Sequence, residues 1–214
     1  VVSGYADVIV LRHHEVGGAA RAAAIASVPV INAGDGKGGQ HPTQALLDLY
    51  TIYKEVKTID GVRVAFVGNL ADGRTVRSLA YLLGKFERVK LYFVAPPELQ
   101  VRQDILDYLT RHGIWFALRN DLREVLPEVD VVYCTRIEPE RLREIHEEQH
   151  TSRLPYYIDH ALLQLLPRDA LIMHPLPRLH EIATCVDADP RAAYFRQTTN
   201  GVLVRMALLA SVLK

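Results

Sequence analysis

The sequence predicts an α/β protein with two lobes, each a parallel sheet flanked by helices, the first lobe being incomplete. Short β-branched runs alternate with amphipathic stretches along almost the whole chain, a pattern typical of βαβ units in parallel sheets. A polar turn at residues 57–61 ends one long amphipathic stretch and precedes a new β-branched run. Such a turn indicates a break between two lobes.

The strands are predicted from short runs rich in β-branched residues. They are residues 6–11, 28–33, 62–68, 89–95, 114–118, 129–135, 156–158 and 170–173. The first two strands are too few to form a stable lobe by themselves. We therefore expect the first lobe to lack most of its sheet.

The helices are predicted from apolar residues at helical spacing between these strands. They are residues 17–26, 42–56, 75–86, 98–112, 139–149 and 191–214. The last helix carries Ala, Leu and Val on more than one face, so it needs cover and is expected to return to the first lobe. The chain thus divides into residues 1–57, residues 58–190 and the terminal helix.

Composition excludes several classes of function. The chain has 214 residues, 49% of them apolar, and its 25 basic residues balance 25 acidic ones, so nothing draws it to nucleic acid or to an anionic membrane. Cys134 and Cys185 are too few for a disulfide framework, and no window approaches the ~20 apolar residues of a membrane span. We expect a cytoplasmic protein that acts on a small molecule. Its start, Val1, is no initiator Met and opens no signal pattern, which fits a fragment or processed product.

Basic side chains follow several predicted strands directly. They are Arg12, Arg74, Arg136 and, a little further from its strand, Arg178. In open α/β sheets ligands bind outside the carboxyl ends of the strands. Arg74 also stands at the start of a predicted helix, where backbone N–H groups favour anions. An isolated arginine after a strand is more often a solvated surface residue, but together these arginines indicate a cleft for a small polyanion.

Glycine-rich turns at residues 34–39 and 68–73 match neither common nucleotide-binding motif. The second turn lacks the three spaced glycines of a dinucleotide site, and the first lacks the lysine–hydroxyl ending of a P-loop. The first turn leads through His41 into a predicted helix. No cofactor is therefore expected.

Residues 146–150 match the sequence pattern of a zinc site. His146 and His150 are four residues apart with Glu147 between them, which is the spacing of zinc proteases. The surrounding helix is mostly charged and no third ligand follows, so we interpret it as a solvated face and expect no metal.

Four motifs together resemble the aspartate carbamoyltransferases, and in that family's order they cover nearly the whole chain. The motifs are His-Pro-Thr-Gln at residues 41–44, Gly-Arg-Thr-Val at 73–76, Thr-Arg at 135–136 and His-Pro-Leu-Pro-Arg at 174–178. Relatives that act on ornithine carry Cys in the first motif and His-Cys-Leu-Pro in the last, whereas this chain has Thr43 and Pro175. Two arginine forks also suit a dicarboxylate and repel a cationic side chain.

The resemblance implies a carbamoyltransferase fold, with a carbamoyl-phosphate domain that includes the interdomain helix, followed by an aspartate domain. Arg12, His41 and Gln44 would contact carbamoyl phosphate, with Arg12 and His41 as the catalytic residues. His41 would donate to the carbonyl oxygen as negative charge develops. The carbonyls of Pro175 and Leu176 would hold the carbamoyl NH2.

The same resemblance implies how aspartate would bind. Arg74 would take the α-carboxylate and Arg136 the β-carboxylate, with Leu176 beside them and a cis bond before Pro177. Glu138 stands where the family carries a Gln that helps to hold aspartate. An anion there repels the substrate, so Glu138 points away, is protonated or marks a changed substrate. The departing phosphate would accept the amine proton, since no side chain is an obvious general base.

The resemblance also implies an assembly. Family members form homotrimers with shared active sites, with regulatory or dihydroorotase subunits as further candidates, and make N-carbamoyl-L-aspartate for pyrimidine biosynthesis. The family's Ser-Thr-Arg-Thr phosphate cradle would precede Val1, so we expect the isolated fragment to bind phosphate weakly and to be inactive. Two alternatives stay open: a non-catalytic scaffold subunit, and a carbamoyltransferase for another amino acid.

Overall fold

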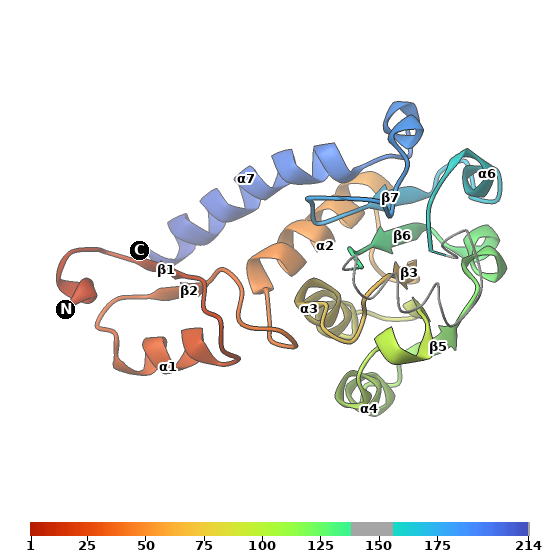
Figure 1. Ribbon diagram of the computed structural model, residues 1–214. Helices are drawn as coiled ribbons and strands as arrows, with labels where there is room; N and C mark the ends of the chain where they lie inside the picture. The colour runs from red at the N-terminus through yellow and green to blue at the C-terminus, as the bar shows by residue number, and fades with distance from the viewer. Residues whose placement is uncertain (138–155, 214) are drawn as a thin grey trace.

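The computed structural model describes residues 1–137 and 156–213 and contains two parallel sheets (Figure 1). The smaller sheet pairs β1 (Ile9–Leu11) with β2 (Val30–Asn32), and α1 (Gly18–Ile25) connects them. The larger sheet has the order β5-β4-β3-β6-β7. Its strands are β3 (Arg63–Val67), β4 (Lys90–Val94), β5 (Trp115–Arg119), β6 (Val131–Cys134) and β7 (Leu171–Met173).

The order of the larger sheet reverses at its centre. From β3 the chain proceeds outward through β4 to β5, and then returns to place β6 on the other side of β3. The carboxyl ends of β3 and β6 are therefore neighbours at the topological switch point, which is where open α/β sheets bind ligands. The inner strands are almost completely buried, as expected for a parallel sheet covered on both faces.

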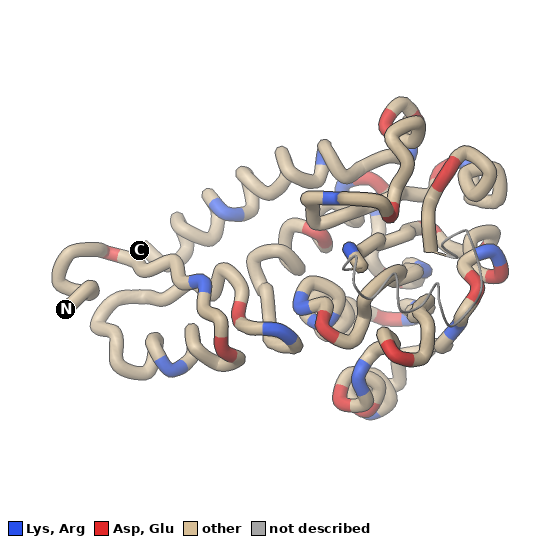
Figure 2. The backbone as a smooth tube through the Cα atoms, viewed as in Figure 1, with Lys and Arg blue, Asp and Glu red and all other residues tan. Residues whose placement is uncertain are grey.

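Two long helices connect the lobes. α2 (Pro42–Val56) leads from the smaller sheet to the larger one, and α7 (Tyr194–Val212) runs back so that the C-terminus ends near β1 (Figure 1). The two helices pack against each other, and α2 also packs on α3 (Arg74–Leu83). Acidic and basic positions are interspersed over the larger lobe (Figure 2).

The structure differs from the sequence predictions at several places. Residues 156–158 form no strand, since only an isolated bridge between Ile158 and Ile182 is present. The helix predicted over 98–112 begins only at α4 (Gln103–Arg111), because Pro97 starts a separate 3-10 turn and the chain then runs extended through Arg102. The terminal helix begins at Tyr194 rather than at residue 191.

Some short elements were not predicted. A one-turn helix, α6 (His160–Leu163), starts at Asp159, whose side chain accepts a hydrogen bond from the Leu162 N–H. Four other short 3-10 helices are η1 (Val2–Gly4), η3 (Leu122–Glu124), η4 (Leu126–Glu128) and η5 (Thr184–Ala188). The helix predicted over residues 139–149, with its candidate zinc residues, lies outside the described residues.

In the described part of the chain, no helix is long and apolar enough to cross a membrane.

Candidate anion-binding active site

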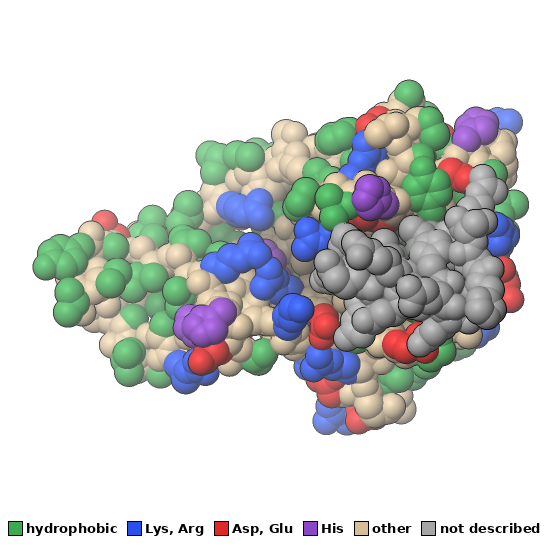
Figure 3. Space-filling view, viewed as in Figure 1, with side chains coloured by type: hydrophobic (Ala, Val, Ile, Leu, Met, Phe, Trp, Pro, Cys, Tyr) green, Lys and Arg blue, Asp and Glu red, His purple; other side chains and the backbone are tan. Residues whose placement is uncertain are grey.

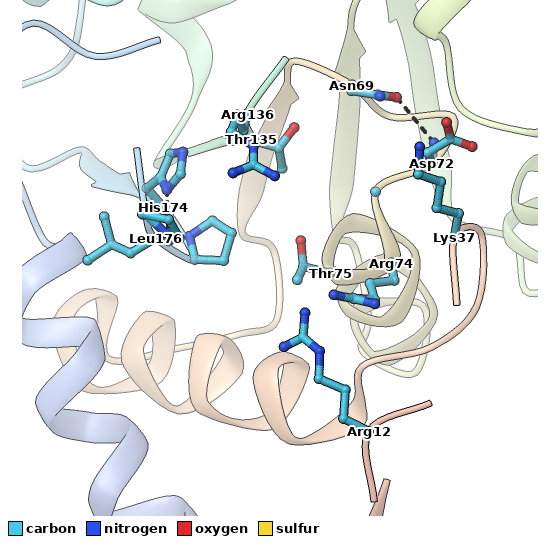
Figure 4. Close-up of a pocket in the computed structure, with 13 residues that line it drawn as sticks. Arg12, Lys37, Asn69, Asp72, Arg74, Thr75, Thr135, Arg136, His174 and Leu176 are labelled. Atoms are coloured by element: carbon cyan, nitrogen blue, oxygen red, sulfur yellow. Dashed lines mark hydrogen bonds between the residues drawn. The ribbon is translucent and has the colours of Figure 1, made fainter. Parts of the chain in front are cut away.

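A cavity of about 310 Å³ opens between the two lobes (Figure 4). Its wall comes from the smaller lobe and from the carboxyl ends of β3, β6 and β7. The lining residues are Arg12, Lys37, Asn69, Asp72, Gly73, Arg74, Thr75, Thr135, Arg136, His174, Pro175, Leu176 and Pro177. The volume is at the small end of the range for pockets that bind small molecules.

The lining residues of the cavity come from segments that follow parallel strands. Arg12 follows β1, Arg74 opens α3 after β3, and Arg136 comes two residues after β6. Residues 174–177 follow β7 directly. Because parallel strands end at the same edge of a sheet, these side chains converge although they are far apart in sequence.

Gly68 allows the ends of β3 and β6 to approach closely. Its φ is +118°, and a Cβ at this position would lie 2.3 Å from the Thr135 carbonyl oxygen. Any other residue would be strained and would push Thr135 away. The glycine therefore helps to place Thr135 and Arg136 on the cavity wall.

The cavity is strongly cationic. Arg12, Lys37, Arg74 and Arg136 line it, and Figure 3 shows basic side chains gathered between the two lobes. The single acidic side chain among the lining residues, Asp72, is already paired with Arg102, which lies outside the cavity, at 2.7 Å. The start of α3 adds the positive end of a helix dipole. The site therefore favours a ligand with more than one negative charge.

Arg12 and Arg74 extend toward each other near Thr75, with Arg136 on the opposite side (Figure 4). Arg74 also donates to the backbone carbonyl of Asp35. Burial lowers the pKa of Arg74, and the adjacent charge of Arg12 lowers it further. An arginine still remains charged near neutral pH, so the Arg74 guanidinium is repelled by that of Arg12.

His41 is partly buried and is not among the lining residues, but it lies next to Arg74. A Cβ at Gly34 would be 3.3 Å from His41 Cδ2 and 3.6 Å from Arg74 Cζ, so the imidazole and the guanidinium flank the same glycine. The backbone N–H of His41 donates to the Ser78 hydroxyl at 2.7 Å, which fixes the loop against α3. Burial lowers the pKa of His41 to about 4, with further lowering by nearby arginines, Arg74 first.

The ring contacts of His41 indicate its tautomer. The Thr43 hydroxyl lies 3.4 Å from His41 Nδ1. If this hydroxyl donates to Nδ1, the single proton of the neutral ring is on Nε2. A neutral Nε2–H group is a hydrogen-bond donor that adds no charge to a cavity already rich in cations.

We expect His41 to stay neutral from about pH 5.5 to about pH 8, unlike an ordinary histidine. NMR of the ring carbons would show no titration of His41 in this range. A midpoint above pH 6 for His41 would contradict the expectation. Because the folded pKa lies below the ordinary 6.5, the unfolded state takes up the proton first. The contribution of His41 to the unfolding free energy therefore falls as pH falls from 6.5 toward 4.

Gln44 is buried and also does not line the cavity; its Nε2 donates to Asp48 Oδ1 at 2.8 Å. The Leu176–Pro177 bond is cis, and Leu176 has a φ of 50°. The Leu176 N–H donates to His174 Nδ1 at 2.8 Å, and His174 Nε2 lies 2.7 Å from Glu181 Oε1. This ring and its carboxylate hold the turn that closes one side of the cavity.

The structure brings together six of the predicted site residues and separates others. Those on the cavity wall are Arg12, Arg74, Arg136, Pro175, Leu176 and Pro177. His41 and Gln44 are not among the lining residues, and Glu138 lies outside the described residues. The site assignment did not include Lys37, Asp72 or Asn69, although Asn69 and Asp72 stand in the turn after β3, and that position could have indicated them.

Fold and cavity together define a two-lobed α/β protein with a cationic cavity at facing strand ends. The sequence pattern of the family described as "Aspartate/ornithine carbamoyltransferase, Asp/Orn binding domain" matches residues 60–212. The pattern of "Aspartate/ornithine carbamoyltransferase, carbamoyl-P binding domain" matches residues 1–54. The chain belongs to the aspartate/ornithine carbamoyltransferase family.

Individual relatives point to the aspartate branch. The chain is 55% identical over 212 residues to the chloroplastic aspartate carbamoyltransferase of Oryza sativa, covering 99% of this chain and 58% of the relative. It is 57% identical over 212 residues to that of Arabidopsis thaliana, covering 99% of this chain and 54% of the relative. The chain thus spans a little more than half the length of these relatives.

Solved structures are similar over the whole chain. The Trypanosoma cruzi aspartate transcarbamoylase in complex with N-(phosphonacetyl)-L-aspartic acid has a TM-score of 0.92 at 41% identity, covering 100% of this chain and 68% of that one. The catalytic subunit of the Methanocaldococcus jannaschii enzyme has a TM-score of 0.90 at 46% identity, covering 99% and 68%. The predicted fold class is confirmed.

Proposed function

We propose that this chain carries the aspartate-binding part of an enzyme that transfers the carbamoyl group of carbamoyl phosphate to L-aspartate. The observation that carries the proposal is the cluster of Arg12, Arg74 and Arg136 around one cavity of metabolite size. A carbamoyl phosphate and a dicarboxylate together supply the negative charge that such a cluster needs. Relatives in complex with carbamoyl phosphate and aspartate support this choice of ligands.

The proposed reaction needs positioning and charge stabilisation rather than a general base. The amine of aspartate attacks the carbamoyl carbon and a new C–N bond forms. The C–O bond to phosphate then breaks, and phosphate leaves with the electron pair and accepts a proton from the amine. Arg74 and Arg136 hold the two carboxylates and aim the amine. Arg12 and the His41 ring stabilise charge on the carbonyl oxygen.

Two other functions compete with this one. A scaffold subunit without activity would have no physical need for three arginines around one cavity, because like charges held close together repel each other. A carbamoyltransferase for a cationic amino acid such as ornithine would place that cation beside Arg74 and Arg136. Glu138 stands where a change of residue would alter the choice of amino-acid substrate. The specificity for aspartate is therefore tested by direct measurement.

The test is an assay of the full-length protein with radiolabelled carbamoyl phosphate and either L-aspartate or L-ornithine. We expect carbamoyl-aspartate as the product and a kcat/KM for ornithine at least about a hundredfold lower, since about 3 kcal/mol is the order of a misplaced charge next to an arginine. No turnover with any amino acid would favour the scaffold. Turnover of another amino acid would show a changed substrate.

The remaining features of assembly and location are also proposals. A homotrimer with shared sites is proposed from the family resemblance alone. The apolar side chains exposed on α7, among them Val202, Leu203 and Met206, mark a contact surface that suits either the rest of the first lobe or another subunit. Regulatory or dihydroorotase subunits stay further candidates, as does a role in pyrimidine biosynthesis. A cytoplasmic location is proposed for this chain, although the plant relatives are named chloroplastic.

A further inference from the structure

Asp48 is a buried carboxylate that the proposed reaction does not use. It lies on α2 with none of its surface exposed. Three neutral donors surround it: Gln44 Nε2 at 2.8 Å and Gln197 Nε2 at 2.6 Å, both to Oδ1, and the Tyr133 hydroxyl at 2.6 Å to Oδ2. A buried carboxylate without a cation in hydrogen-bond contact is costly, so its presence needs a reason.

The three donors come from three elements that each lead to the cavity. Gln44 lies one turn before Asp48 on α2, and Tyr133 is on β6, two residues before Thr135 on the cavity wall. Gln197 is on α7, and its Oε1 accepts from the His174 N–H at 3.0 Å. Asp48 therefore joins the helix that enters the larger lobe to the strand ends of the site.

One of these paths reaches the cavity wall through an unbroken chain of hydrogen bonds. Asp48 holds the NH2 of Gln197, the oxygen of Gln197 holds the His174 N–H, and His174 Nδ1 accepts from the Leu176 N–H at 2.8 Å. Leu176 belongs to the turn whose carbonyls are expected to bind the carbamoyl NH2. A change at Asp48 is thus transmitted to Leu176 on the cavity wall through three successive hydrogen bonds.

The Asp48 carboxylate selects one orientation of the side-chain amides of Gln44 and Gln197. An amide side chain presents a donor at one end and an acceptor at the other, and Oδ1 only accepts. Oδ1 therefore takes the NH2 ends of Gln44 and Gln197, and the oxygen of Gln197 turns toward His174. For Gln44 the atom left over is its Oε1, an acceptor that matches a carbamoyl NH2.

This selection does not depend on the charge of Asp48. Burial raises the pKa of Asp48 to about 7, against the lowering effect of its three hydrogen bonds. A proton on Oδ2 would be donated to the oxygen of Tyr133, and Oδ1 would still accept from both amides. Asparagine can make the same set of contacts with its oxygen in the Oδ1 place.

We propose that Asp48 is a positioning residue of this site, whose Oδ1 acceptor fixes the Gln44 and Gln197 amides and, through Gln197, the turn at His174–Leu176. The inference rests on the proposed function, because it assigns Asp48 to the same ligand cavity. Asp48 itself touches no cavity surface, so its effect is indirect.

The same two helices provide a matched control. One turn beyond Asp48, the Thr51 hydroxyl accepts from Asn200 Nδ2 at 3.0 Å. Both residues are buried between α2 and α7, but Thr51 donates to the Leu47 carbonyl and Asn200 accepts from Lys54. These contacts lead away from the cavity, so Thr51→Val weakens the helix pair without reaching the site.

The experiment compares Asp48→Leu, Asp48→Asn, Gln197→Met and Thr51→Val in the full-length protein. We expect Asp48→Leu and Gln197→Met to lower kcat/KM for carbamoyl phosphate about tenfold or more, the order expected when a binding group is displaced. Asp48→Asn should stay within about threefold of wild type, because its oxygen keeps both amides in place. Gln197→Met breaks a single link of the chain, so it serves if Asp48→Leu does not fold.

Thermal unfolding of each variant separates positioning from stability. Thr51→Val should lower Tm as Gln197→Met does and leave kcat/KM unchanged. Wild-type kinetics in Gln197→Met, a loss in Asp48→Asn equal to that in Asp48→Leu, or an equal kinetic loss in Thr51→Val would each overturn the inference.

A binding measurement separates this inference from the proposed reaction. Calorimetry with N-(phosphonacetyl)-L-aspartate as the probe needs no turnover. If the wild-type protein binds the probe but transfers no carbamoyl group, the proposed reaction fails. Weaker binding in Asp48→Leu and Gln197→Met, with Asp48→Asn and Thr51→Val unchanged, would then still support the positioning role. Equal binding by all variants would overturn it.

Discussion

Replacing His41 by alanine is expected to lower kcat by about 10²- to 10³-fold, the usual effect of removing one oxyanion donor. The ring and the Arg74 guanidinium flank Gly34, and burial lowers the pKa of His41 to about 4. A neutral ring can donate from Nε2 to a carbonyl oxygen that becomes negative in the transition state. It adds no positive charge that would bind the ground-state phosphate equally well, so its effect falls on kcat.

The measurement is steady-state kinetics of the full-length protein with both substrates. His112→Ala removes the exposed histidine that follows α4 and serves as the control, with kcat unchanged. Thermal unfolding of His41→Ala should stay near wild type, since the loop is held by the backbone bond to Ser78. A fall in kcat of less than threefold, or a loss of the folded state, would return His41 to a structural role.

The class of the fold could be predicted from sequence because strand and helix periodicity are local. The regular segments that form β3, β4 and α2 carry clear patterns, and their positions agree with the prediction to within about two residues. Segments without such a pattern were assigned less well. Residues 156–158 looked like a strand, but only Ile158 makes a bridge before Asp159 caps a helix.

The site could be predicted in part, because the strand-end rule selects residues without knowing which strands are neighbours. Arg74 and Arg136 follow strands that are not consecutive in sequence, and only the pairing of β3 with β6 brings them to one cavity. Composition holds no information on that pairing. The motifs supplied it indirectly, through their likeness to a family.

Burial and long-range partners were beyond the sequence. Nothing in the spacing of His41 indicates that three arginines, one of them Arg205 on α7, act on its ring. The salt bridge between Asp72 and Arg102 joins two segments thirty residues apart and pairs the acidic side chain of the cavity with a cation. Such contacts depend on tertiary packing between residues far apart in the sequence, so the sequence alone does not show them.

Replacing Arg74 or Arg136 by alanine is expected to raise KM for aspartate by about 10- to 100-fold, with a much smaller change for carbamoyl phosphate. Each guanidinium would hold one carboxylate by charge-assisted hydrogen bonds of about 1.5–3 kcal/mol. Lysine at either position keeps the charge but loses the two-pronged geometry, so an intermediate KM is expected. Arg77→Ala is the control, because Arg77 is in α3 but pairs with Asp104 away from the cavity.

The two variants should also change which inhibitors bind. Wild-type protein is expected to bind succinate better than butyrate, because succinate reaches both arginines. Loss of Arg136 leaves one arginine to hold a carboxylate, so the preference for the dicarboxylate should shrink by about tenfold. The measurement is competitive inhibition against aspartate for wild type and both variants. Unchanged aspartate kinetics in both variants, or equal affinity of the wild type for succinate and butyrate, would contradict the assignment of these arginines to a dicarboxylate.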